Sequence, residues 1–350
     1  MPISCYASFD EALEALAGYG IELKNGNSNH APMVGEALCA LGRPQAVMPW
    51  IAAYKERLLP RGPAGDPIHP DAWRSALGHR ERFAAWAEFF AKELQQAPWP
   101  DVLDRWTERL VPGFGAAATH GVIRVGHAVR SLAEAETPWR RRELGDALAS
   151  WAATYRELPS SDRIADCPMR PRAAIARVPI LPPPRRRSLG NITASLAMLD
   201  DFLEFAPVIG LLDVGGDIKG LLAELTDVFT RIYLANAHDV LTSIVFIHGV
   251  TSLTALGEIV PHVGERTAIA ALRYGWQTAC ALYACFGANS MVAHTEQCAA
   301  DAETLIDRAL ANGDEHVIKF TEACLRRNAL GPSPVYWAAV EHALGIMHRR

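Results

Sequence analysis

The chain has 350 residues, of which half are hydrophobic, and a formal net charge of -5 at pH 7. That length is enough to bury one large core or two ordinary ones. The mildly acidic balance excludes a general electrostatic attraction to nucleic acid or to an anionic membrane, and it favours a small-molecule or protein partner.

The N-terminal segment and the cysteines indicate a cytoplasmic protein. Asp10, Glu11 and Glu14 lie where a signal peptide would need a basic start followed by an apolar run. The seven cysteines form no CxxC pair, and an odd number favours reduced thiols over disulfides or a zinc-thiolate site. The longest apolar stretches, such as 240–250, are interrupted by polar residues before they reach the roughly 18 residues of a membrane span. We expect them to form buried core and no membrane segment.

Hydrophobic residues recur at a spacing of three and four along most of the chain. The pattern is clearest over 71–97, 222–236 and 301–330, and it is the period of an amphipathic helix. Alternating strand-like runs are nearly absent, and the one Asn-Gly pair, Asn25 and Gly26, has no paired runs around it. The sequence therefore predicts an all-α fold.

The segment 113–118, GFGAAA, fits a loose form of the dinucleotide-binding fingerprint. That motif needs a strand before it, a helix after it and an acidic residue about 20 positions later. The preceding residues instead form a helical pattern that ends at Pro112. We interpret the glycines as a turn into the next helix, so no motif supports binding of NADPH or a flavin.

His120 and His127 are seven residues apart, with Arg124 between them. On a regular helix they share a face but lie about 10.5 Å apart along the axis. Both can reach one metal ion only if the helix begins at His120, an irregular start that the glycines at 113, 115 and 121 would permit. Alternatively, one histidine is a ligand and the other supports it. Arg124 is predicted either to face a substrate oxygen or to form an ion pair on the helix surface.

A stretch rich in proline and arginine interrupts the helical pattern over 177–191. Its four prolines and four arginines exclude a regular helix, so it is a loop or a linker. The best metal-ligand candidates lie on both sides of it. We therefore favour one bundle-like domain over 1–350, with this stretch as a surface excursion.

Five of the twelve histidines have apolar or small neighbours. A single histidine in such surroundings is more often a hydrogen-bonded core residue than a metal ligand. Five are harder to explain in this way, because each buried imidazole needs partners or costs about 1 to 3 kcal/mol. They are His30, His120, His127, His248 and His294.

Lys319 lies between Ile318 and Phe320 on a predicted helix. From the sequence alone, the favoured interpretation is an exposed lysine paired with Glu315, four residues earlier. If the lysine is buried instead, desolvation would lower its pKa and favour the neutral amine.

Four segments together resemble the questin oxidase-like family: 29–42, 112–132, 247–256 and 314–323. The likeness extends from about 24 to 330, and the combination of NHAP with THGVIRVGHA is its most specific part. The resemblance implies an oxidative enzyme of the kind that opens anthraquinone rings. Members are described as Baeyer-Villiger oxidases, sometimes NADPH-dependent, and some resemble non-haem iron dioxygenases with several histidines and a carboxylated lysine at the metal.

On this basis we expect an O₂-dependent oxidoreductase that uses Fe(II) to oxidise a polycyclic aromatic or quinone substrate. The expected ligands are His30, His120, His127 and His248, with Lys319 as a carbamate. His294 and then His316 are the reserves, His316 because it lies three residues before Lys319 on one helical face. The alternatives are a non-catalytic helical binding protein and an NADPH-dependent flavin monooxygenase.

Overall fold

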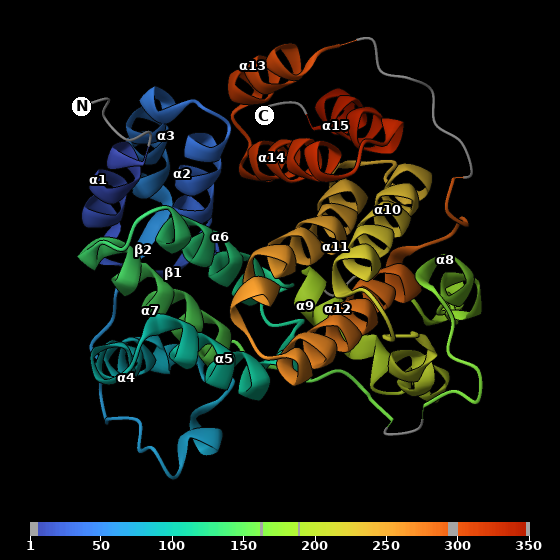
Figure 1. Ribbon diagram of the computed structural model, residues 1–350, viewed down its shortest axis with the longest axis horizontal. Helices are drawn as coiled ribbons and strands as arrows, with labels where there is room; N and C mark the ends of the chain where they lie inside the picture. The colour runs from blue at the N-terminus through green and yellow to red at the C-terminus, as the bar shows by residue number, and fades with distance from the viewer. Residues whose placement is uncertain (1–5, 162–163, 188–189, 293–299, 348–350) are drawn as a thin grey trace.

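The computed structural model describes residues 6–161, 164–187, 190–292 and 300–347 (Figure 1). About 70% of the chain is helical, and within the described residues the strands are one short antiparallel pair. The prediction of a predominantly helical fold is confirmed. The paired strands are β1 (Tyr19–Leu23) and β2 (Leu58–Pro60).

The α-helices before the proline and arginine stretch are α1 (Ala7–Leu16), α2 (Ala31–Ala40), α3 (Val47–Tyr54), α4 (Phe83–Gln96), α5 (Trp99–Leu110), α6 (His120–Glu134), α7 (Pro138–Ala153) and α8 (Pro171–Ala174). Those after it are α9 (Ile192–Leu196), α10 (Ile218–Asn236), α11 (Val240–Ile259), α12 (Glu265–Phe286), α13 (Ala302–Asn312), α14 (Glu315–Leu330) and α15 (Pro334–Ile346). Short 3₁₀ turns are found at Pro44–Ala46, Lys55–Arg57, Trp73–Ala76, Arg80–Arg82, Val111–Gly113, Ile175–Arg177, Pro183–Arg185, Ala197–Leu199, Leu203–Leu211 and Val260–His262.

Helices α6 and α11 lie at the middle of the molecule. Figure 1 shows α1 to α7 on one side and α10 to α12 on the other, with α13 to α15 above them. Helix α6 packs against α2, α7 and α11, and α14 packs against α2, α11, α13 and α15. Helices α2, α6, α11 and α14, from distant parts of the sequence, therefore meet around one point.

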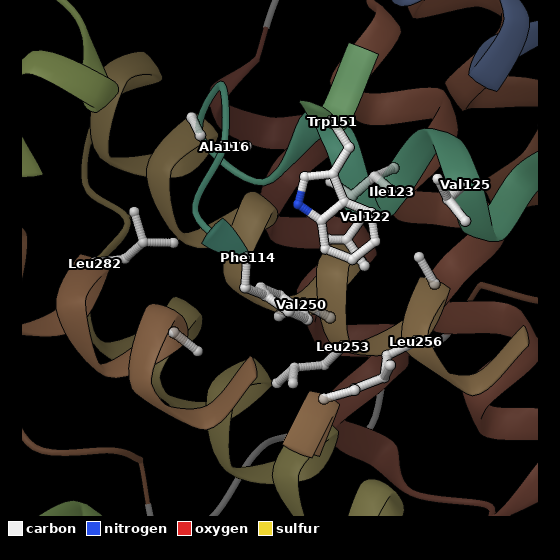
Figure 2. Close-up of a cluster of buried hydrophobic side chains, with 14 of the residues drawn as sticks. Phe114, Ala116, Val122, Ile123, Val125, Trp151, Val250, Leu253, Leu256 and Leu282 are labelled. Atoms are coloured by element: carbon white, nitrogen blue, oxygen red, sulfur yellow. The ribbon is translucent and has the colours of Figure 1, made fainter. Parts of the chain in front are cut away.

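Two glycines allow α6 to approach its neighbours closely. A Cβ atom at Gly126 would lie 2.6 Å from the carbonyl oxygen of Ala255 on α11, and one at Gly121 would lie 2.8 Å from the Trp151 ring on α7. Figure 2 shows Trp151 beside Val122 in the core between these helices. A larger side chain at either glycine would push the helices apart, because protein interiors leave no spare room.

One hydrophobic cluster contains residues from both sides of the 177–191 stretch. A smaller cluster joins α1, α2 and α3 to Ile306 of α13 and Ile318 of α14. The stretch itself holds only a short 3₁₀ turn among its described residues. The shared core supports a single domain over 1–350, which stays a prediction.

Helix α11 and the turn after it, Val240–His262, are long and apolar enough to cross a membrane by length and composition. The expectation that no stretch would reach that length is therefore corrected for this segment. However, 72% of its most apolar window is buried inside the protein, against α6, α10, α12 and α14. The apolar character of α11 is that of a helix at the centre of a folded core.

Candidate metal centre

Four histidines from four helices converge on one point inside the protein. His30, His120, His248 and His316 each offer a ring nitrogen, and these nitrogens all lie within 4.8 Å of one another. His30 directly precedes α2, and the other three lie in α6, α11 and α14. Three of them belong to the ligand set expected from the sequence, and the fourth, His316, was its second reserve.

Local helix geometry explains how two of these rings are placed. His30 is the N-cap residue of α2, and Pro32 in the first turn favours a helix start at this position. Asp314 caps α14 by accepting hydrogen bonds from the backbone N–H groups of His316, at 2.8 Å, and Val317, at 3.3 Å. His316 therefore lies in the first turn of its helix, facing the N-terminus of α2.

His120 is the first residue of α6, the helix start that joint binding with His127 would require. The irregular backbone that precedes it is not formed by the glycines. Instead Ala117, Ala118 and Thr119 have φ values of 47°, 56° and 73°, a left-handed turn that costs L-residues about 1 to 2 kcal/mol each. Three successive residues in this conformation therefore lead directly into the converging His120.

We expect this strain to be measurable at Ala118. Ala118→Gly should change the free energy of unfolding by less than about 1 kcal/mol, because relief of strain offsets the lost methyl burial and the added chain entropy. Ala118→Val should lower it by about 2 kcal/mol, since a β-branched residue tolerates this region poorly. Chemical denaturation tests both variants. The matched control is Ala128→Gly inside α6, which should cost about 1 kcal/mol; an equal cost at Ala118 would contradict the strain.

Hydrogen bonds to backbone carbonyls fix the orientation of three rings. The Nδ1 atoms of His30, His120 and His248 lie 2.7, 2.5 and 2.7 Å from the carbonyl oxygens of residues 28, 117 and 244. A carbonyl only accepts, so each Nδ1 carries the proton, and in a neutral ring Nε2 is then a bare acceptor.

These bare acceptors point at one another. His120 Nε2 is 2.7 Å from His30 Nε2 and 3.3 Å from His248 Nε2. Two lone pairs at such distances repel unless a cation lies between or beside them. A carbonyl-bound Nδ1–H with a free Nε2 is also how proteins orient histidines that bind metals. The donor chemistry of the cluster therefore fits a metal ion.

Burial keeps these rings neutral. Desolvation lowers the pKa of His30, His120 and His248 well below the usual value, and the neighbouring Lys319 or the other imidazoles lower it further. The side chain of His316 is 10% exposed, and its Nδ1 lies 3.3 Å from Asp314 Oδ1. Neutral imidazoles are the form that binds metal, so no proton has to be displaced from His30, His120 or His248 at neutral pH.

Lys319 is buried next to this cluster. It is 2% exposed, one turn after His316 on α14, and desolvation lowers its pKa to about 7. Glu315, the partner suggested by the sequence alone, lies 3.5 Å from Arg57 instead. The interpretation of Lys319 as an exposed lysine is therefore wrong, because α14 packs this face against α2 and α11.

His127 lies outside the group of four histidines. Its Nδ1 is 2.6 Å from Glu36 Oε2, and burial lowers its pKa to about 4 despite that carboxylate. It lines a narrow, water-sized cavity together with Lys319. This geometry favours the alternative in which His127 supports the centre from outside; its role as a ligand stays a prediction.

Glu36 is the centre of a buried charge network that the sequence analysis missed. It is fully buried on α2, accepts a 2.7 Å bond from the Tyr6 hydroxyl and forms an ion pair with Arg130, which also binds Glu322 at 2.5 Å. Although burial opposes ionisation, Arg130 and the bond from His127 hold the pKa of Glu36 below its usual value. A lone acid in the otherwise apolar helix 31–40 was the available signal.

Arg124 is part of a buried ion pair. The Nε and Nη2 atoms of Arg124 donate to the Glu143 carboxylate at 2.6 and 2.8 Å, and both side chains are buried. Two of its nitrogens are thus already engaged, and its contact with a substrate stays a prediction. His294, the first reserve, lies outside the described residues.

The family model described as questin oxidase-like matches residues 27–166. None of the curated proteins compared with the chain matches it. The matched segment holds His30 and His120 and ends before His248, His316 and Lys319. The family resemblance seen in the sequence is thereby confirmed over residues 27–166, where the chain is similar to the questin oxidase-like family.

Proposed function

We propose that the chain is an O₂-dependent oxidoreductase that inserts oxygen into, or cleaves, a polycyclic phenolic or quinone ring with the help of iron. The match to the questin oxidase-like family indicates an oxidase or oxygenase. The observation that best supports a bound metal ion is the convergence of unprotonated Nε2 atoms from His30, His120 and His248. We propose His316 as the fourth ligand.

The ligand chemistry suits iron. Imidazole is a common ligand of Fe(II), and a site held by protein nitrogens with positions left open can bind O₂ and substrate together. Bound iron would supply the activation of O₂. The chain itself holds the rings of His30, His120 and His248 through hydrogen bonds from Nδ1–H to backbone carbonyls, and it keeps bulk water away from these rings by burial.

We propose that Lys319 supplies the anionic oxygen that four neutral imidazoles lack. Its amine would attack CO₂, forming a carbamate and releasing one proton. The helices α2, α6 and α14 all begin at this centre, and the positive ends of their dipoles favour an anion there. Burial also favours the neutral amine over the ammonium, which is the form that reacts.

Metal analysis of protein purified without chelators tests this function. We expect about one iron per chain, no bound flavin, and O₂ consumption with a panel of hydroxylated anthraquinones. A yellow protein that turns over NADPH would favour the flavin monooxygenase alternative. A metal-free protein that binds these compounds without consuming O₂ would be the non-catalytic binding protein.

A further inference from the structure

A pocket of about 510 Å³ lies on the outer side of the histidine centre. It is formed by α3, by the beginnings of α11 and α14, and by the residue that follows α15. Its volume falls within the range of pockets that hold small organic ligands, about 300 to 1,000 Å³. Its lining includes Trp50, Ala53, Tyr54, Arg57, Asp314 and Glu315.

Aromatic rings form one wall of this pocket. Trp50 and Tyr54 are stacked with centroids 4.5 Å apart and planes 18° apart. Trp50 is anchored by a 3.0 Å hydrogen bond from its indole N–H to the carbonyl oxygen of Gly313. Tyr54 is buried, and the Arg57 guanidinium lies 4.8 Å from its ring centroid, so the half-buried indole of Trp50 is the ring that offers a face on which a flat molecule packs favourably.

The pocket is connected to the centre by direct contacts. The Tyr54 hydroxyl lies 3.2 Å from His30 Nδ1 and accepts a 3.1 Å bond from the His30 backbone N–H. Asp314 and Glu315 immediately precede His316, whose side chain is 10% exposed. A ligand in this pocket therefore lies against the residues that position two of the four imidazoles.

The charges of the pocket select the kind of ligand. Arg57 lies 3.5 Å from Glu315, so its charge is partly compensated, while Asp314 adds a second carboxylate. Asp314 also occupies the first N–H groups of α14, which removes the helix terminus as an anion site. Two carboxylates offer acceptors to hydroxyl donors and repel anions.

We propose that this pocket binds the substrate as an uncharged, hydroxylated planar aromatic molecule, stacked against Trp50 and donating O–H bonds to Glu315 or Asp314. The assignment of this ligand as the substrate rests on the proposed function. The site itself does not require bound metal.

Filling the pocket tests the proposal without disturbing the core. Ala53 is exposed and lines the pocket, whereas the adjacent Ala52 is exposed and does not. Metal-free protein at pH 7 should bind 1,8-dihydroxyanthraquinone, followed by its visible absorbance. Ala53→Phe should weaken this binding at least about tenfold, and Ala52→Phe should leave it unchanged. Equal affinities of the two variants would overturn the proposal.

Two further measurements address the ring wall and the charge preference. Trp50→Ala should also weaken the binding of 1,8-dihydroxyanthraquinone about tenfold or more. The control is Trp139→Ala, at a half-buried tryptophan outside the pocket, which should leave the affinity unchanged. The wild type should bind the dihydroxy probe more tightly than anthraquinone-2-sulfonate. Glu315→Gln, which releases Arg57, should narrow that difference. Tighter binding of the sulfonate by the wild type would contradict the charge argument.

Failure of this proposal is separable from failure of the proposed function. Binding that depends on Trp50 and Ala53 without O₂ consumption by the iron-loaded protein would support the pocket and refute the oxygenase. O₂ consumption with a KM unaffected by Ala53→Phe would support the oxygenase and refute the pocket.

Discussion

Replacing His316 with alanine is expected to remove bound iron and abolish O₂ consumption, as is replacement of His30, His120 or His248. Each of these rings supplies one of four nitrogens that lie within 4.8 Å of one another. His127→Ala is expected to weaken metal binding by only about 10- to 100-fold, because its Nδ1 binds Glu36 and its contribution is indirect. Metal content per chain and O₂ uptake measure both effects.

The control for these substitutions is His342→Ala. His342 is a half-buried histidine that lies 3.1 Å from the Tyr233 hydroxyl and outside the cluster. It should keep its iron and its turnover. If His127→Ala loses iron as completely as His120→Ala while His316→Ala keeps it, the ligand set expected from the sequence, which includes His127, is correct. The set with His316 is then wrong.

The sequence predicted helical character better than helix boundaries. The run 71–97 was one helical pattern, but α4 begins only at Phe83. Gly78, with a φ of 76°, breaks the run where a Cβ atom would lie 2.9 Å from the carbonyl oxygen of Tyr155. Because this contact joins residues distant in the sequence, the hydrophobic periodicity of 71–97 does not reveal it.

In the run 301–330, the residues themselves contain the signals of a helix boundary. The run divides at Gly313, which has a φ of 73°, into α13 and α14. Gly313 ends the first helix in the left-handed conformation and Asp314 caps the second, a sequence of stop and start signals. The hydrophobic period continued across them and concealed the break.

The histidine cluster was only partly accessible from the sequence. Apolar neighbours identified His30, His120 and His248, because buried rings need such surroundings. His316 was only the second reserve, chosen because it lies three residues before Lys319 on one helical face. Only the packing of α14 against α2 and α11 shows that its first turn faces inward.

Lys319→Ala is expected to abolish O₂ consumption, and added bicarbonate should not restore it, because no amine remains to form the carbamate. Lys319→Met should also be inactive, but it keeps the volume of the buried side chain. In metal-free, CO₂-free buffer at pH 7, the free energy of unfolding of Lys319→Met should exceed that of the wild type by about 1 to 3 kcal/mol, so the variant is more stable. The reason is that it removes a buried amine whose protonated form is poorly solvated.

The pH dependence of that stabilisation follows from the direction of the shift. The folded-state pKa of Lys319, about 7, lies below the unfolded value near 10.5, so the unfolded chain binds the additional proton between these values. The cost of burying the amine is absent above about pH 10.5, grows as the pH falls towards 7, and is constant below it. The advantage of Lys319→Met should therefore vanish near pH 10.5, whereas Lys92→Met, at an exposed lysine, should show no such trend. Full iron content and full turnover in Lys319→Ala would show that the carbamate is not required and that the four histidines hold the metal alone.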